Sequence, residues 1–258
     1  MRTRLIFLLS AGVSLFTHAA PATLEGTSWV VKKAEINTES ERTLHYQYND
    51  GRLVGRAIHF NQKDIVSTLP EEINCQQPQY KESIATIDDF IKSTMGEADS
   101  PSAKSYELDI NGKERVIVLN PICQKGNFGG ADTGGNSKIV LLKNKIFINW
   151  YDGIILMLAP LDPRIKPDPS FSCSKAKTPS EKTICSDYDL SSYDRSINNA
   201  WKEAKDSAVS PDDKELAGKI LSTQKEWLNK RNACGDDKVC LKNNMVVRLQ
   251  KISSMISK

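Results

Sequence analysis

The sequence has few histidines and none of the short motifs that identify the common enzyme classes. Only three of its 258 residues are histidines, and His18 lies in the N-terminal segment. The nucleophile elbow G-x-S-x-G, the zinc motif H-E-x-x-H and the phosphate loop ending in G-K-[ST] are all absent. The adjacent acids Asp88-Asp89, Asp212-Asp213 and Asp236-Asp237 point in different directions on a helix and make no catalytic dyad. We therefore predict a protein that is not an enzyme and has no catalytic residue, cofactor or metal.

Long hydrophobic runs are also missing, apart from a short one near the start. Residues 5–16 are mostly apolar and follow Arg2 and Arg4, and small residues occupy most of positions 17–22. About a dozen apolar residues are too few to span a bilayer, which takes ~20. A positive start, a short apolar core and a small-residue exit are typical of a secretory signal peptide; an uncleaved anchor is the alternative. We predict that residues 1–22 are a cleaved signal peptide, that the mature chain is periplasmic, and that it has no membrane span.

The six cysteines all follow this segment. An even number in an exported chain indicates disulfides. Proximity along the chain favours Cys75–Cys123, Cys173–Cys185 and Cys234–Cys240, and cross-pairing among the last four is the alternative. A zinc site is disfavoured because there is no C-x-x-C and no histidine near the cysteines.

A strong charge of one sign is absent as well. The net charge is +3; residues 23–170 hold 17 Lys/Arg and 20 Asp/Glu, and residues 171–258 hold 16 and 12. This balance does not favour a nucleic-acid partner.

Proline marks the boundary between two parts of different composition. Three prolines between residues 163 and 169 disfavour both helix and central strand. Strand patterns precede them and helical patterns follow, which predicts the α+β class. We predict a β-rich domain over residues 23–162, a proline-rich linker over 163–170 and a helical domain over 171–258.

The β-rich part is predicted to be an antiparallel β-barrel or a curled sheet. The clearest signal is a meander of strands at residues 138–142, 145–151 and 154–158, separated by short turns. Earlier strands are expected at residues 29–33, 44–48, 53–60 and 63–67.

Two further elements are expected in this part. Asn111-Gly112 is predicted to join strands at 106–110 and 115–119 in a hairpin. One helix is predicted where Ile84, Ile87, Ile91 and Met95 share a face, with Gly96 at its end.

The helical part begins with a capping signal. Thr178-Pro179-Ser180-Glu181 combines an N-cap hydroxyl, proline at the first position and glutamate at the third. Apolar residues at helical spacing then predict a second helix around residues 190–204, a third after Ser210-Pro211 and a fourth from about Val239.

Residues of this part also form a pattern that resembles a known family. The pattern is Phe171-Ser-Cys173, Glu181-Lys-Thr-Ile-Cys185, Leu190, Asp194, Gln224-x-x-Trp227-x-x-x-Arg231-x-x-Cys234, Cys240-Leu241 and Arg248-Leu249. It is similar to the LprI-type lysozyme inhibitor domain, a small disulfide-linked helical module of exported bacterial proteins. Met245 and Trp201 depart from it, since tyrosine is common at both positions. We expect Leu190 and Trp227 in the core and Arg231 in an ion pair with Asp194 or Glu181; contact with a partner is the alternative role.

The resemblance implies a protein partner and an inhibitory function. We predict a periplasmic inhibitor that occludes the cleft of a cell-wall (peptidoglycan) hydrolase. It would be either a lysozyme inhibitor or an immunity protein against a secreted antibacterial toxin, for example one delivered by a type VI secretion system. The alternatives are a non-enzymatic structural or docking protein of the envelope and an unrecognised hydrolase.

A glycine-rich loop at residues 124–137 is a second candidate for partner contact. It contains five glycines, and loops held on a rigid sheet often carry binding residues. We predict a partner-binding loop with Phe128 as its apolar anchor, flanked by Lys125, Asn127 and Asp132; a plain surface connection is the alternative.

Overall fold

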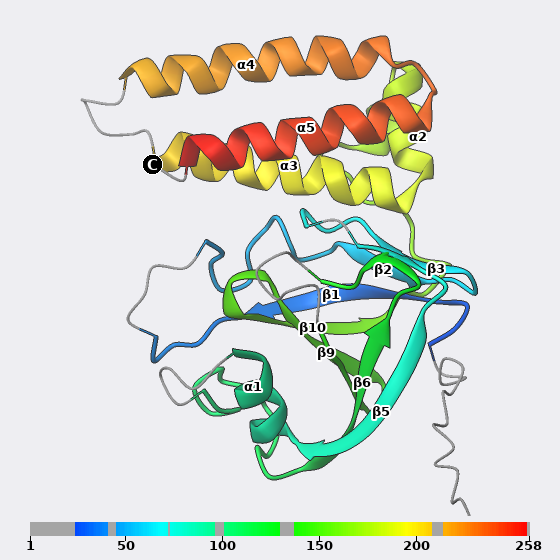
Figure 1. Cartoon of the computed structure of the whole chain (residues 1–258). Helices are drawn as coiled ribbons and strands as arrows, with labels where there is room; N and C mark the ends of the chain where they lie inside the picture. Colours follow the sequence, from blue (N-terminus) through cyan, green and yellow to red (C-terminus); the bar gives the residue numbers. More distant parts are fainter. Residues whose placement is uncertain are drawn as a thin grey trace, which may run out of the picture.

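The computed structural model describes residues 24–40, 45–71, 73–95, 101–129, 137–207 and 214–256. A curled sheet forms one half of the molecule and a layer of long helices covers it on one side (Figure 1). The predicted α+β class is confirmed. The predicted signal peptide lies outside the described residues. Within the described ranges no helix is long and apolar enough to cross a membrane.

Ten antiparallel strands make up the sheet in the described part of the chain. Their order across it is β5-β6-β8-β9-β10-β1-β2-β3-β4-β7. The strands are β1 Thr27–Glu35, β2 Ala57–Phe60, β3 Asp64–Ser67, β4 Asn74–Gln76, β5 Gln79–Thr86, β6 Arg115–Ile122, β7 Lys125–Asn127, β8 Ile139–Leu142, β9 Lys145–Trp150 and β10 Ile154–Pro160.

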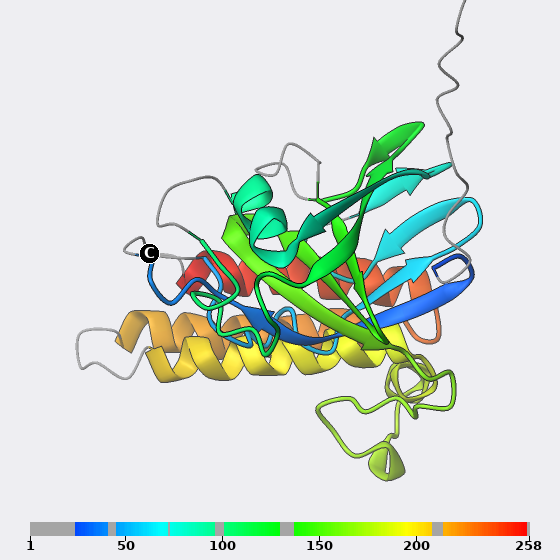
Figure 2. The same cartoon turned by 90° about the horizontal axis from the view of Figure 1, so that it is seen from below.

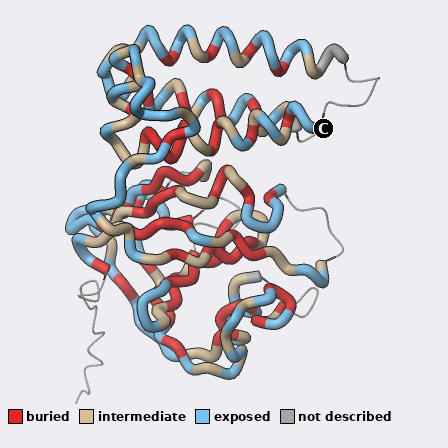
Figure 3. Tube along the Cα trace, turned by 180° about the vertical axis from the view of Figure 1, so that it is seen from behind, coloured by how far each residue is buried: buried red, intermediate tan, exposed pale blue. Residues whose placement is uncertain are grey.

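The sheet has a hydrophobic core on each face. One core includes Trp29, Phe60, Leu119 and Trp150, all buried inside the curl. The other lies on the opposite face, where helix α1, Ile87–Met95, packs on strands that include β6 and β9. Figure 3 shows the buried residues concentrated in the strands and on the helices next to them. Period-two alternation lets one strand supply both cores.

The predicted meander is confirmed as β8, β9 and β10. Strand β9 pairs antiparallel with both β8 and β10. The turn before β10 has Asp152 at φ 61° and Gly153 at φ 72°. Both are left-handed conformations, which glycine adopts freely and aspartate tolerates better than most residues.

The predicted hairpin at Asn111-Gly112 is wrong. Residues 103–107 form turns, and Tyr106 is buried, with its hydroxyl donating to the Gly153 carbonyl at 2.7 Å. Strand β6 pairs instead with β5 and β8. Ile84 therefore belongs to β5, and helix α1 begins three residues later, at Ile87. The burial of Tyr106 against the α1 side of the sheet outweighs the local turn signal.

Two of the earlier strand predictions also need correction. Residues 45–56 form turns and bends, so the strand expected at 44–48 is absent from the described residues 45–48 and β2 starts only at Ala57. Strands β1 and β3 lie where they were expected. Gly96 lies outside the described residues.

The helical half has four helices in the described residues. They are α2 Pro179–Ser186, α3 Tyr188–Ser207, α4 Lys214–Ala233 and α5 Lys238–Ile256. The capping box is confirmed: the Glu181 amide donates to Thr178 Oγ1 at 3.1 Å, and Glu181 Oε2 accepts from the Thr178 amide at 3.0 Å. Ser210-Pro211 lies outside the described residues.

All three favoured disulfides are present. Cys75–Cys123 lies in the β-rich half, next to the β4–β7 pair. Cys173–Cys185 joins the single turn η3, Cys173–Lys175, to α2. Cys234–Cys240 closes the turn between α4 and α5.

The three disulfides should differ in their effect on stability. In the loop-entropy model, loss of Cys75–Cys123, with a sequence separation of 48, lowers the free energy of unfolding by about 4 kcal/mol. Loss of Cys234–Cys240, with a separation of 6, lowers it by about 2 kcal/mol. Urea unfolding of the two Cys→Ala double variants measures this difference. A larger loss for the Cys234–Cys240 variant would contradict it.

Candidate functional site

A buried ion pair holds the helical half together. Arg231 on α4 places Nη1 3.3 Å from Asp194 Oδ1 on α3, and both side chains are buried. Arg231 Nη2 also lies 3.8 Å from Glu181 Oε1 on α2. Arg231 thus reaches both of the acids expected as its partners. A buried pair of this kind fixes how helices meet, because either charge alone would be costly to bury.

Two aromatic rings flank this pair. The guanidinium carbon of Arg231 is 5.5 Å from the Trp227 ring centroid and 5.9 Å from that of Phe171. Rings at this distance attract a cation through their quadrupole. The Trp227 indole donates to the Asn244 carbonyl on α5 at 3.3 Å. Trp227 and Leu190 lie in the helical core.

Asp194 also fixes the segment that leads into α2. Its Oδ2 accepts from the Ser170 amide at 2.8 Å and from the Ser170 hydroxyl at 2.6 Å. The Asp168 amide donates to Ser191 Oγ at 2.8 Å. The end of the proline-rich segment is therefore bonded to α3.

Gln224 and Arg248, two further residues of the family pattern, join α4 to α5. Arg248 donates to Gln224 Oε1 through Nε at 3.1 Å and through Nη2 at 2.7 Å. Its Nη1 donates to Thr223 Oγ1 at 3.2 Å. Seven polar or aromatic residues of the pattern are thus buried or half-buried and contact other parts of the helical half: Phe171, Glu181, Asp194, Gln224, Trp227, Arg231 and Arg248. Their contacts within the structure therefore serve internal packing.

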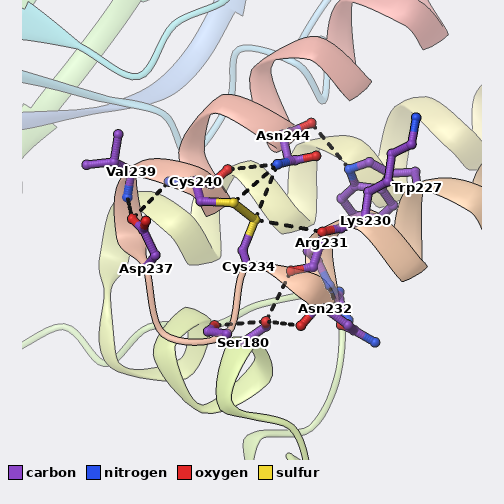
Figure 4. The surroundings of a disulfide bond; sticks show 11 residues. Ser180, Trp227, Lys230, Arg231, Asn232, Cys234, Asp237, Val239, Cys240 and Asn244 are labelled. Carbon is purple, nitrogen blue, oxygen red and sulfur yellow. Dashed lines mark hydrogen bonds between the residues drawn. A yellow bond between two sulfur atoms is a disulfide. The ribbon is translucent and has the colours of Figure 1, made fainter.

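The turn between α4 and α5 is tied to α2 as well as closed by a disulfide (Figure 4). The buried Ser180 hydroxyl lies 3.1, 3.2 and 2.8 Å from the carbonyls of Arg231, Asn232 and Gly235. The side-chain amide Nδ2 of Asn244 donates to the Cys240 carbonyl at 3.0 Å. This end of the module is consequently well connected.

The opposite side of the module, α3 and α5, faces the β-rich half. Arg56 is fully buried there, with its guanidinium carbon 3.5 Å from the Tyr193 ring centroid. Burial lowers the pKa of Arg56 to about 10, so the group is still charged at neutral pH. Among the described residues its nitrogens have no hydrogen-bond partner, which leaves the ring as its main counterpart.

Further contacts cross the same interface. The Tyr188 hydroxyl donates to the Gly55 carbonyl at 3.0 Å. His59 Nε2 on β2 lies 3.2 Å from both carboxylate oxygens of Asp189. A methyl group at Gly51 would stand 2.9 Å from Asn199 Cβ, closer than side chains normally approach. The two halves therefore meet closely, and the face of α3 turned to the sheet is covered.

Two adjoining cavities lie between α5 and the segment after β3. Their volumes are about 590 and 220 Å³, and both are lined by Leu69, Pro70 and Tyr193. The smaller one contains Glu71, whose carboxylate accepts from the Tyr46 hydroxyl and, at 2.8 Å, from the Trp150 indole. Glu71 is the one carboxylate among the described lining residues, so these cavities offer no pair of acids for glycoside hydrolysis.

The structure does not support Phe128 as the apolar anchor of the predicted partner-binding loop. Phe128 is fully buried in the sheet core, 6.4 Å from Phe60 between ring centroids, so it is not available to a partner. Lys125 and Asn127 are exposed on the short strand β7, and Asp132 lies outside the described residues. The glycine-rich sequence suggested an exposed Phe128 side chain, but this ring packs in the hydrophobic core of the sheet.

The helical half also carries exposed lysines that the sequence did not single out. Lys175, Lys177 and Lys182 lie in or beside the stretch that Cys173–Cys185 closes, and all three are exposed. The sequence did contain a signal for this cluster, since three lysines lie within eight residues between the two cysteines of a predicted disulfide. The His59–Asp189 contact had no local signal, since its partners are 130 residues apart.

Comparison with known proteins identifies the helical half. Residues 173–256 match the family model described as lysozyme inhibitor LprI. The match covers about a third of the chain and confirms the resemblance for that part. No curated protein and no solved structure matches the chain. The β-rich half has no family assigned, and residues 173–256 are called the LprI module from here on.

Removal of one partner of the buried ion pair should destabilise the LprI module strongly. We expect Arg231→Met to lower the free energy of unfolding by about 3–5 kcal/mol, because Asp194 would stay buried without its counter-charge. Urea unfolding followed by the helical signal at 222 nm measures this. The exposed pair Arg164–Asp162 is the control, and Arg164→Met should leave stability unchanged. Equal effects of the two substitutions would contradict the structural role.

The contact between the two halves should depend on pH through His59. The hydrogen bond to Asp189 raises the pKa of His59 above its ordinary 6.5, and burial opposes this shift. Because the folded pKa is the higher one, the stabilisation is complete below pH 6.5 and disappears as the pH rises through the folded pKa.

Melting curves between pH 5.5 and 8.5 test this dependence. His59→Gln should remove the loss of stability with rising pH, whereas His45→Gln should retain it. A wild-type pH profile that is unchanged in His59→Gln would exclude the contact as its source.

Proposed function

We propose that this protein is a periplasmic inhibitor of a peptidoglycan hydrolase, and that it acts by occluding the enzyme's cleft. The match of residues 173–256 to the lysozyme inhibitor LprI family carries the proposal. The protein itself performs no chemistry, and its partner is another protein.

The construction of the LprI module supports this function. A protein inhibitor binds tightly when its contact surface is already ordered, since little conformational entropy is then lost. Two disulfides, the buried Arg231–Asp194 pair and the Arg248–Gln224 bonds hold four helices in one arrangement. The three disulfides also suit an oxidising compartment such as the periplasm, which agrees with the exported chain expected from the sequence.

Two classes of target fit this proposal. One is a lysozyme, as the family description states. The other is a secreted antibacterial toxin with the same activity, such as a type VI effector, in which case the protein confers immunity. Both are glycan hydrolases with a long substrate cleft, so one mechanism of occlusion serves for either.

An inhibition assay separates the inhibitor from a structural protein. The oxidised mature protein should abolish peptidoglycan degradation by its target at a molar ratio near one to one. The panel contains lysozymes of several classes and the secreted hydrolases encoded beside its gene. A reduced, alkylated sample of the same protein is the matched control and should inhibit less. If no hydrolase is slowed and none is retained on the immobilised protein, the proposal is wrong and a docking role in the envelope replaces it.

A further inference from the structure

A short exposed segment projects from the LprI module. It runs from the proline-rich stretch through η3 to the start of α2, and residues 172–175 and 177 are all exposed. Figure 2 shows the chain between β10 and α2 looping out from the rest of the molecule. A segment that projects in this way can enter the cleft of a partner enzyme.

This segment is held at both ends. Before it, the amide and hydroxyl of Ser170 are bonded to the buried Asp194. Within it, Cys173 is joined to Cys185 on α2, and behind it the Thr178 capping box fixes the first turn of that helix. An exposed segment anchored in this way loses little conformational freedom on binding.

The segment carries an excess of positive charge. Lys175, Lys177 and Lys182 are exposed. The one acid between them, Glu181, accepts from the amides of Thr178 and Lys177 at 3.0 and 2.8 Å, and these bonds lower its pKa.

Other acids near this end lie outside the projecting residues 172–177. Asp187 is 2.8 Å from Lys238 Nζ, and Asp237 accepts from the first amides of α5. Residues 172–177 hold Lys175 and Lys177 and no acid, so the projecting part has a net charge of +2.

The rest of the module is less suited to enter a cleft. The sides of α3 and α5 that face the sheet are covered by the β-rich half through Arg56–Tyr193 and His59–Asp189. The cavities along α5 are concave. Of the surfaces described above, the projecting lysine segment is the one that both protrudes and carries a net positive charge.

We propose that residues 172–177 enter the substrate cleft of the hydrolase, with Lys175 and Lys177 facing the acidic side chains there. The inference rests on the proposed function. Glycan hydrolases place two carboxyl groups across the scissile bond, about 5–10 Å apart, so their clefts are acidic where catalysis occurs. Two lysines at the tip of a rigid segment match this charge, and complementary charges of this kind raise the rate of association and the specificity.

Charge reversal tests the segment directly. Lys175→Glu/Lys177→Glu should raise the inhibition constant for the target hydrolase about tenfold or more, because two attractions become repulsions. The matched control is Lys219→Glu/Lys225→Glu, two exposed lysines of α4 in the same module, which should inhibit like the wild type. Both variants should keep the wild-type melting temperature, since all four side chains are exposed.

A small ligand tests the location. A chitin oligosaccharide that fills the cleft of the hydrolase should compete with the wild-type protein for binding, and the apparent affinity should fall as the oligosaccharide concentration rises. Binding that is independent of the oligosaccharide would overturn the inference.

The outcomes separate this inference from the proposed function. If the wild type inhibits and the Lys175→Glu/Lys177→Glu variant inhibits equally, the segment is not the contact and the inhibitory function stands. If only the α4 control loses inhibition, the contact lies on α4. If the wild type inhibits nothing in the panel, the function and the segment are both rejected.

Discussion

The buried pair between Arg231 and Asp194 is the interaction on which the LprI module depends. Asp194 accepts bonds from Arg231 on α4 and from Ser170 ahead of η3, while Arg231 also approaches Glu181 on α2. One carboxylate therefore relates two long helices and the projecting segment to each other. A charge in this position must be matched on burial, so the arrangement has few alternatives. The segment that we place in the enzyme cleft derives its orientation from this pair.

The β-rich half constrains the same module from the other side. Arg56 stacks on Tyr193, and Tyr188 donates to the Gly55 carbonyl, so α3 is fixed against the turns that precede β2. This contact leaves residues 172–175 and 177 exposed. In an inhibitor built in this way, the LprI module would bind the enzyme. The β-rich half would determine which surface of the LprI module stays exposed. At Gly51 a methyl group would stand 2.9 Å from Asn199 Cβ, so the two halves approach closely there.

Local chemistry explains which predictions succeeded. The capping box at Thr178 and Glu181, the disulfides within short stretches and the β8–β9–β10 meander all depend on residues close together in the sequence. The failures depended on distant residues. Asn111-Gly112 is a strong hairpin signal, yet Tyr106 is buried against the α1 side of the sheet and β6 pairs with β5. Phe128 looked free in a glycine-rich loop, but it fills space beside Phe60.

The sequence by itself determined the α+β class and the family resemblance of residues 171–258, and it favoured the cysteine pairing that the structure shows. Spacing, capping chemistry and composition are properties of neighbouring residues, so they can be recognised without a fold. Only the tertiary structure decided that the family's shared residues contact one another, that Arg56 and His59 meet α3, and that Lys175 and Lys177 are exposed on an anchored segment. Those facts come from packing between elements up to about half the chain apart, where burial and charge pairing select one arrangement.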